Sequence, residues 1–155
     1  MNQSDETWLR RAIALSVKSR ADGHHPFAAL VVGADGNLIA EAANAHGIDC
    51  TCHAELNAVR LASSTYAAPQ LAGATLYSSA EPCAMCAGGI YWSGIGRVVY
   101  GLSEARLLTL TGNHPENPTL SLPCREVFAR GQRKVEVVGP VLEDEAAEAH
   151  AGFWD

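Results

Sequence analysis

Apolar side chains follow two kinds of spacing along this chain, and the first of them predicts an N-terminal helix. Between residues 5 and 21, apolar positions such as Trp8, Ala12 and Leu15 recur at helical spacing. Asp22-Gly23 then supplies a typical helix stop. The chain is therefore expected to enter its first strand from a long helix.

Short runs of strand length follow this helix. Phe27 to Val32 and Asn37 to Ala43 flank Ala34-Asp35-Gly36, which predicts a β-hairpin. After the hairpin, helical and strand-like segments alternate to the end of the chain. The further predictions are a helix from about Ala54 to Ser63, a strand from Ala74 to Ser79, a helix from 83 to about 92 with Pro82 at its first position, a strand from Arg97 to Gly101, a helical segment at 103–110, a loop at 111–123, a short helical piece from Arg125 to Ala129, a last strand from Lys134 to Val138 and a final helix that opens at Glu143-Asp144-Glu145.

Helices that alternate with strands in this way predict an α/β fold, built as a three-layer α/β/α domain around a mixed sheet. With 155 residues, of which 48% are hydrophobic, residues 1–155 are long enough for one well-formed core and too short for two. Apolar runs such as Ala28 to Val32 are far shorter than the roughly 20 residues of a membrane span. The N-terminal Met1 to Glu6 is acidic and polar, unlike a secretory signal, so the protein is expected to be cytoplasmic.

The charge balance limits the kind of substrate. Acidic residues outnumber basic ones by 17 to 11, and the formal net charge is −6. Phosphate contacts supply most of the affinity of proteins for nucleic acids, so a broad basic binding surface is not expected here. A small-molecule substrate is favoured over a long nucleic acid.

Two short segments carry the residue types of a metal centre. His53-Ala54-Glu55 is followed 30 residues later by Pro82-Cys83-Ala84-Met85-Cys86. One imidazole and two thiolates give three ligands for zinc and leave a fourth position open for water, as catalytic zinc sites require. Helices that begin near both segments would turn their positive ends toward the thiolates. His53, Cys83 and Cys86 are therefore candidate metal ligands.

Glu55 is the candidate catalytic group. The helical period places it with Ala58, Val59 and Ala62 on an apolar face that points inward. A buried carboxylate is costly without a partner, and an activated water and a ring nitrogen of a substrate would be such partners. The alternative is a solvated Glu on a misjudged face.

The cysteines allow a second ligand set, in which Cys50-Thr51-Cys52 and the Cys83–Cys86 pair form a structural zinc site with four protein ligands and no position for water. Its C-x-C half is tighter than the usual C-x₂₋₄-C spacing, and it would leave Glu55 without a role. The odd total of five cysteines argues against a disulfide framework, and Cys124 is expected to be a buried or free thiol. The four residues of this alternative set are Cys50, Cys52, Cys83 and Cys86.

Further polar residues are candidates for a substrate pocket. Asn44 leaves a predicted strand nine residues before His53, and its amide can present a donor and an acceptor to a base edge, although a turn-forming Asn fits equally well. None of the remaining histidines shows ligand spacing by itself. Pocket positions stay open for His24, His25 and His46 and, within the poorly readable residues 102–133, for Asn113, His114 and Glu116.

The pattern His-x-Glu followed by Pro-Cys-x-x-Cys resembles that of the zinc-dependent nucleobase deaminases. From Pro26-Phe27-Ala28 through the two metal segments to Val98-Val99-Tyr100-Gly101, about half of the chain is similar to the cytidine/deoxycytidylate deaminase superfamily. The stretch from Cys83 to Trp92 most resembles the branch of bacterial guanine deaminases, tRNA adenosine deaminases and fungal-type cytosine deaminases.

This resemblance implies a five-stranded mixed sheet flanked by helices, usually in a homodimer. It also implies one Zn²⁺ per subunit, with water or hydroxide as the fourth ligand. The implied metal ligands are His53, Cys83 and Cys86, the implied proton shuttle is Glu55, and the implied base contacts are Asn44 and Phe27.

Two departures from the branch concern the substrate. Branch members usually have Asp-Pro-Thr-Ala before the His, where this chain has Asp49-Cys50-Thr51-Cys52, and the loop after Asn44 is about two residues shorter. The chain ends in Phe153-Trp154-Asp155 without basic residues, as free-base deaminases rather than tRNA deaminases do. Phe153 and Trp154 are therefore candidate substrate contacts that close the pocket; the alternative is that they anchor the last helix to the core.

The sequence thus predicts a zinc-dependent hydrolytic deaminase that releases ammonia from a free nucleobase or a small nucleoside-like heterocycle, with guanine the first candidate. The alternatives are A-to-I deamination of tRNA adenosine, deamination of cytosine or another nucleoside, and, in a different class, a zinc-stabilised binding module without catalysis. The choice of base depends on a few pocket contacts in the loop after Asn44 and in the C-terminal tail.

Overall fold

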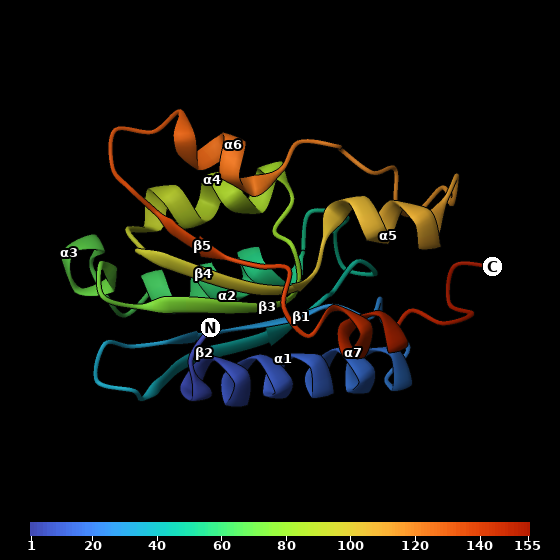
Figure 1. The fold of residues 1–155 in the computed structure, drawn as a ribbon, viewed down its shortest axis with the longest axis horizontal. Helices are drawn as coiled ribbons and strands as arrows, with labels where there is room; N and C mark the ends of the chain where they lie inside the picture. The colour runs from blue at the N-terminus through green and yellow to red at the C-terminus, as the bar shows by residue number, and fades with distance from the viewer.

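A five-stranded sheet runs through the middle of the molecule and carries helices on both faces (Figure 1). The computed structural model describes residues 1–155 throughout. The strand order is β2-β1-β3-β4-β5; β1 is antiparallel to β2 and β3, and β4 is parallel to β3 and β5. The predicted mixed sheet is thereby confirmed. Its strands are β1 (Ala28–Val32), β2 (Leu38–Ala43), β3 (Thr75–Ala80), β4 (Arg97–Leu102) and β5 (Glu136–Val138).

The predicted hairpin joins β1 to β2. The Asp35 side chain accepts the backbone N–H of Asn37 at 3.0 Å, and Gly36 has a φ of +82°, a conformation that favours glycine. The pairing register shifts between Val31 and Val32. This hairpin makes β2 an edge strand, from whose end the chain passes into a loop and then into the next helix.

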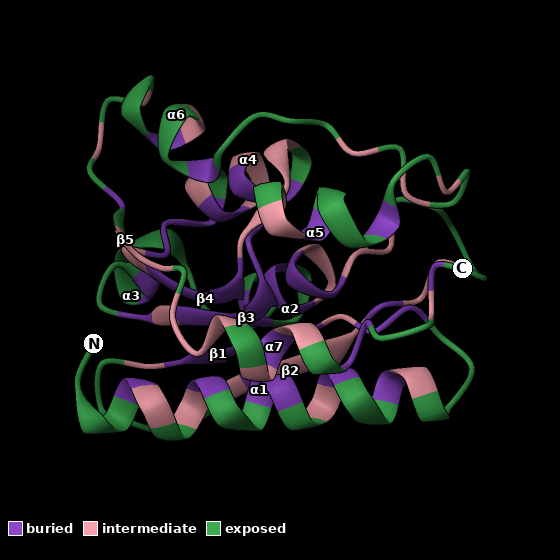
Figure 2. Ribbon diagram, turned by 45° about the vertical axis from the view of Figure 1, so that its right-hand side comes forward, coloured by how far each residue is buried: buried purple, intermediate pink, exposed green.

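Two layers of helices bury both faces of the central strands. In Figure 1, α1 and α7 lie on one side of the sheet, and α2, α4 and α6 lie on the other. The α1 helix turns a buried stripe toward the sheet and an exposed face toward solvent (Figure 2). No helix is both long and apolar enough to cross a membrane. The helices are α1 (Gln3–Ala21), α2 (Ala54–Ser63), α3 (Ala68–Leu71), α4 (Ala84–Ser93), α5 (Glu104–Thr111), α6 (Cys124–Ala129) and α7 (Glu143–Glu148).

Most differences from the sequence prediction lie at the ends of elements. Pro82 is not the first residue of α4, because Cys83 is the N-cap, with extended backbone (φ −66°, ψ 172°), and its carbonyl accepts the first intrahelical bond. The short helix α3 was not predicted. The last strand is shorter than Lys134 to Val138, since only Glu136–Val138 form the strand that pairs with β4.

Candidate active site

The imidazole and the two thiols of the sequence motif come together where two helices begin. The ligating atoms of His53, Cys83 and Cys86 all lie within 4.8 Å of one another, and His53 Nδ1 is 3.5 Å from Cys83 Sγ. His53 is the N-cap of α2 and Cys83 is the N-cap of α4, and neither side chain caps its own helix. Their donor atoms are therefore free to bind an ion.

Close packing of α2 against α4 brings the two helix starts together. At Gly89 of α4, an added Cβ would come within 2.7 Å of Leu56 Cδ1 of α2. A glycine at this position lets the helix backbones approach, as small residues do at helix crossings. Strand β3 ends at Ala80, and the short connection Glu81-Pro82 leads from it to Cys83 at the start of α4. The metal group is thus assembled by the sheet and by one helix contact.

The electrostatics of the group favour a thiolate. The hydrogen bond from the Cys86 thiol, and then the interaction with His53, lower the pKa of Cys83 to about 4. The hydrogen bond with Cys83 and burial raise the pKa of Cys86. Thiolates and neutral imidazole are the forms that ligate zinc. An imidazole and two sulfurs converging on one point fit a tetrahedral zinc ion with one position left open.

The structure does not assemble the alternative four-cysteine site. The only metal-compatible group that contains Cys83 and Cys86 has His53 as its third member, and it includes neither Cys50 nor Cys52. Both of these cysteines lie in a loop, and Cys50 is exposed. The loop is folded by its own turn, in which the Cys52 N–H donates to the Asp49 carbonyl at 2.9 Å. Cys124 is buried and unpaired, as predicted.

Glu55 is a buried carboxyl group next to the metal group. Its residue is 5% exposed, on the same inward face of α2 as Ala58, Val59 and Ala62, as the helical period predicted. The Ser78 hydroxyl donates a hydrogen bond of 2.8 Å to Glu55 Oε1. Burial raises the pKa of Glu55, with a further contribution from the negative charge of Cys83. A carboxyl group in this setting can both accept and release a proton.

A cavity of about 390 Å³ opens beside these groups, near the lower end of the size range of small-molecule sites. Its walls come from the segment before β1, the loops after β2 and β3, the starts of α2 and α4, helix α5 and the segment between α5 and α6. The lining includes these sequence-predicted residues: Phe27, Asn44, His53, Glu55, Cys83, His25, His46 and Glu116. His24, Asn113 and His114, which were open pocket positions, do not line it.

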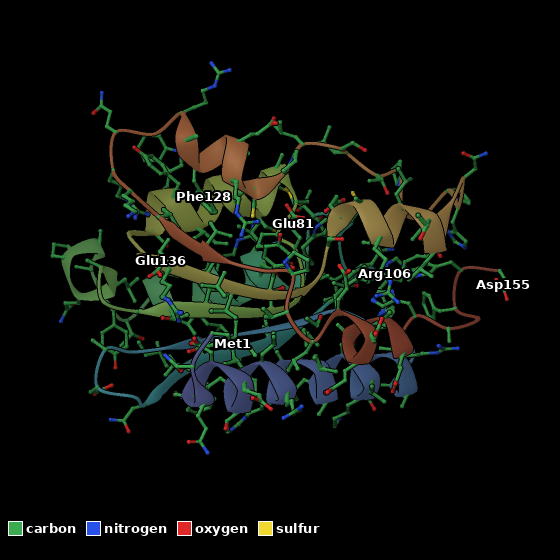
Figure 3. The ribbon with its side chains drawn as sticks, in the orientation of Figure 1. Met1, Glu81, Arg106, Phe128, Glu136 and Asp155 are labelled. Atoms are coloured by element: carbon green, nitrogen blue, oxygen red, sulfur yellow. The ribbon has the colours of Figure 1, made fainter.

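Two acidic residues of the cavity were not recognised from the sequence as pocket groups. Glu81, labelled in Figure 3, accepts the backbone N–H of Glu104 at 3.0 Å and that of Cys124 at 2.9 Å, so its carboxylate anchors the starts of α5 and α6. Glu104 is half-buried, and burial raises its pKa to about 8, with the negative charge of Cys83 as the next cause. A zinc ion would offset that charge but not the burial. Glu104 can thus present a neutral acid to the cavity.

Asn44 lies at the start of the loop between β2 and α2. Its side chain is buried, and Oδ1 accepts the backbone N–H of His46 at 2.8 Å, which is the turn-forming arrangement. The side chain nevertheless lines the cavity. With Oδ1 already engaged, the Nδ2 group is the part of the amide that remains for a ligand.

The C-terminal aromatic residues do not line the cavity but pack behind its wall. Trp154 is buried, with ring centroids 5.2 Å from His25 and 6.1 Å from Phe27, and its indole N–H donates to His150 Nδ1 at 3.0 Å. The Phe153 ring packs edge-on against Trp154 at 4.7 Å. Trp154 thus packs against two residues that line the cavity, His25 and Phe27. The role of the tail as a lid stays a prediction.

Comparison with known proteins provides an independent line of evidence. Residues 2–102 match the model of the family described as the cytidine and deoxycytidylate deaminase zinc-binding region. The matched residues are more than half of the chain and contain His53, Glu55, Cys83 and Cys86.

Relatives with different substrates share this similarity. A probable cytosine deaminase of Schizosaccharomyces pombe is 43% identical over 156 residues, which cover 100% of this chain and 95% of the relative. A tRNA-specific adenosine deaminase of Bacillus subtilis is 30% identical over 152 residues, covering 97% and 88%. The solved structure of a guanine deaminase from Nitrosomonas europaea matches with a TM-score of 0.77 at 26% identity, covering 96% of this chain and 83% of that one.

Proposed function

Because this chain belongs to the family of cytidine and deoxycytidylate deaminases, and is therefore a zinc-dependent hydrolase of carbon–nitrogen bonds, we propose that its substrate is a free nucleobase or a small nucleoside-like heterocycle. The observation that carries this proposal is the cavity of about 390 Å³ into which His53, Cys83 and the buried Glu55 converge. A cavity of this size suits a single heterocycle. The product is ammonia together with the base in which oxygen replaces the amino group.

The metal group and Glu55 divide the chemistry between them. Zinc, when bound by His53, Cys83 and Cys86, supplies an activated water for attack on the carbon that carries the amino group. Glu55 takes one proton from the attacking water and delivers it to a ring nitrogen, and it then passes the proton of the added hydroxyl to the amino group, which leaves as ammonia. The hydrogen bond from Ser78 orients Glu55 Oε1. Burial raises the pKa of Glu55, which helps the carboxyl group to hold a proton between its uptake from water and its delivery to the substrate.

Three further residues are proposed to recognise the base. Asn44 offers its Nδ2 group as a hydrogen-bond donor, and Phe27 offers an apolar wall. Burial, and then the negative charge of Cys83, raise the pKa of Glu104 to about 8, and in its neutral form Glu104 can donate a hydrogen bond to a ring nitrogen or carbonyl oxygen. These donors favour a base that presents acceptors beside its amino group.

Guanine is the first candidate substrate and cytosine the second. Guanine is supported by the structural likeness to a guanine deaminase over 96% of this chain. Cytosine is supported by the probable cytosine deaminase that is 43% identical over the whole chain. A tRNA substrate is disfavoured by the formal net charge of −6, because affinity for nucleic acid depends on basic surface.

Ammonia release from a substrate panel tests the proposed function. The zinc-loaded protein is incubated separately with guanine, cytosine, adenine, their nucleosides and an anticodon stem-loop of tRNA, and ammonia is measured by an enzyme-coupled assay. Turnover is expected with a free base, guanine first. Turnover of the stem-loop alone would contradict the proposal, and release from none of the small heterocycles would remove it.

We also propose that the protein is a homodimer that associates through the outer surface of α2 and α4. Trp92 on α4 is 83% exposed, and the exposed apolar side chains on these two helices also include Leu61 and Met85. Aromatic residues are enriched in protein–protein interfaces, so an exposed indole among other exposed apolar side chains fits such a surface. A second copy of the chain fits because the two faces would be chemically identical and apolar.

Replacing Trp92 by Glu is expected to convert the dimer to a monomer, since it buries a charge in an apolar interface. Light scattering coupled to size-exclusion chromatography measures the mass of both proteins at one concentration. Val17→Glu is the matched control, because Val17 is an exposed apolar residue on α1, on the other side of the sheet. A wild-type protein that elutes as a monomer, or a Trp92→Glu variant that stays dimeric, contradicts this interface.

A further inference from the structure

A second cluster of metal-ligating side chains lies in the cavity wall, apart from the motif residues. His25 precedes β1, His46 lies in the loop after β2, and Glu116 lies in the segment between α5 and α6. The ligating atoms of these three residues all lie within 4.8 Å of one another. Three segments that are distant in the sequence thus converge on one point.

The two imidazoles are stacked and present their nitrogens to the same carboxylate. Their ring centroids are 4.5 Å apart, with an interplanar angle of 20°. His25 Nε2 lies 3.7 Å from Glu116 Oε2, and His46 Nδ1 lies 3.9 Å from Glu116 Oε1. Each nitrogen therefore faces a different oxygen of one carboxylate.

These separations are too long for hydrogen bonds but close to those between ligands of one metal ion. Donor–acceptor distances in hydrogen bonds rarely exceed about 3.2 Å. Two ligand atoms at ~2.0–2.1 Å from a tetrahedral ion lie about 3.4 Å apart. All three ligand atoms lie within 4.8 Å of one another, so a contraction of at most about 1.4 Å, with rotation of one of the stacked rings, would bring the three groups of this cluster onto an ion.

We propose that His25, His46 and Glu116 form a second metal site, which binds a divalent transition-metal ion of the zinc class at the wall of the cavity. Two imidazoles and one carboxylate are a donor set that zinc takes in enzymes. His25 is held for this role on two sides, by the stacked ring of His46 and by Trp154, whose ring centroid is 5.2 Å away. Burial next to His46 also favours the neutral imidazole, the form that ligates.

Binding at this site has a consequence for access to the cavity. Residues 115–120, which include Glu116, line the cavity, whereas His25 and His46 belong to other segments of its wall. A metal ion held by all three residues would tie the 115–120 segment to that wall. Excess zinc is therefore expected to slow the entry and release of small molecules, and so to inhibit the enzyme.

The site is tested by counting zinc at equilibrium. Protein that already carries its tightly bound zinc is dialysed against increasing concentrations of free Zn²⁺, and the bound metal is measured by atomic emission. The wild type is expected to take up one further ion per chain. His46→Gln and Glu116→Gln are each expected to weaken this second binding step at least about tenfold while keeping the first ion. Both side chains are partly exposed, so both variants are expected to fold.

Two controls separate this site from other ligands. His24→Gln removes an exposed histidine that neighbours His25 but lies outside the cluster, and Cys50→Ser combined with Cys52→Ser removes the two loop thiols. Both controls are expected to bind the second ion as the wild type does. Absence of a second ion in the wild type overturns the proposal, as does its loss in the cysteine control or its persistence in both test variants.

The metal count does not depend on the identity of the substrate. If none of the panel compounds is turned over, the second ion can still be counted; if it is absent, deamination can still be measured. Loss of turnover in His46→Gln and Glu116→Gln without any change in zinc binding would identify these residues as substrate contacts and overturn the metal site. In the wild type, excess Zn²⁺ is expected to reduce the rate several-fold, and Glu116→Gln is expected to remove most of this inhibition relative to its own rate without added zinc.

Discussion

Glu55→Gln is expected to keep the bound zinc and to lower kcat by about 10²–10⁴-fold, the usual range for the loss of a general acid–base group. The amide has nearly the shape of the carboxyl group and retains an oxygen that can accept the hydrogen bond from Ser78. It cannot take a proton from water and pass it to a base. Steady-state ammonia release and zinc content, measured on the same preparation, check this prediction.

The form of the kinetic defect distinguishes catalysis from binding. If Glu55 only helps to hold the substrate, KM should rise with little change in kcat; if it moves protons, kcat should fall with KM nearly unchanged. Glu126→Gln, at an exposed position in the first turn of α6, is the matched control and should be active at the wild-type level. Near-normal turnover in Glu55→Gln would remove this residue from the mechanism.

Cys86→Ser is expected to lose both zinc and activity, whereas the combined change of Cys50 and Cys52 to Ser should keep both. Cys86 is buried within the metal group, while Cys50 and Cys52 lie outside it. A neutral hydroxyl is a poor substitute for a thiolate as a zinc ligand. Lowering the pKa of water from 15.7 to about 7 is worth ~12 kcal/mol, so loss of the metal should reduce turnover to background.

Zinc content per chain, measured after removal of loosely bound metal, decides between the two ligand sets. Cys83→Ser should behave like Cys86→Ser, because both sulfurs belong to the same group of three. Circular dichroism shows whether each variant is folded. Full zinc content in Cys86→Ser, or loss of zinc in the Cys50 and Cys52 double variant, would contradict the His53–Cys83–Cys86 site.

Much of the local structure follows from the sequence, since periodicity and turn residues act over a few positions. The bounds of α2 agree with the predicted Ala54 to Ser63, and the hairpin forms around Ala34-Asp35-Gly36. The errors are the missed short helix α3, the start of α4 and a strand whose boundary is set by tertiary pairing. The last strand, for example, extends only as far as β4 offers partners.

The metal motif was also readable from the sequence, because zinc ligation constrains residue types and their spacing at helix starts. In the short segments His53-Ala54-Glu55 and Cys83 to Cys86, the His, Glu and Cys side chains each have a distinct chemical role. What the sequence left open was whether Cys50 and Cys52 would compete for the metal. Only the fold excludes them, through the turn that leaves Cys50 exposed.

The sequence by itself thus determined the class of this protein: an α/β fold that carries a zinc group and a buried carboxyl group. Only the tertiary structure decided the walls of the cavity. Glu104 gains its raised pKa from burial, and His25, His46 and Glu116 meet from segments that are about 20 and 70 residues apart. The physical reason is that a metal motif consists of residues at fixed spacing in short segments of the sequence. The burial of Glu104 and the proximity of His25, His46 and Glu116 arise only after the sheet and its loops have brought distant segments together.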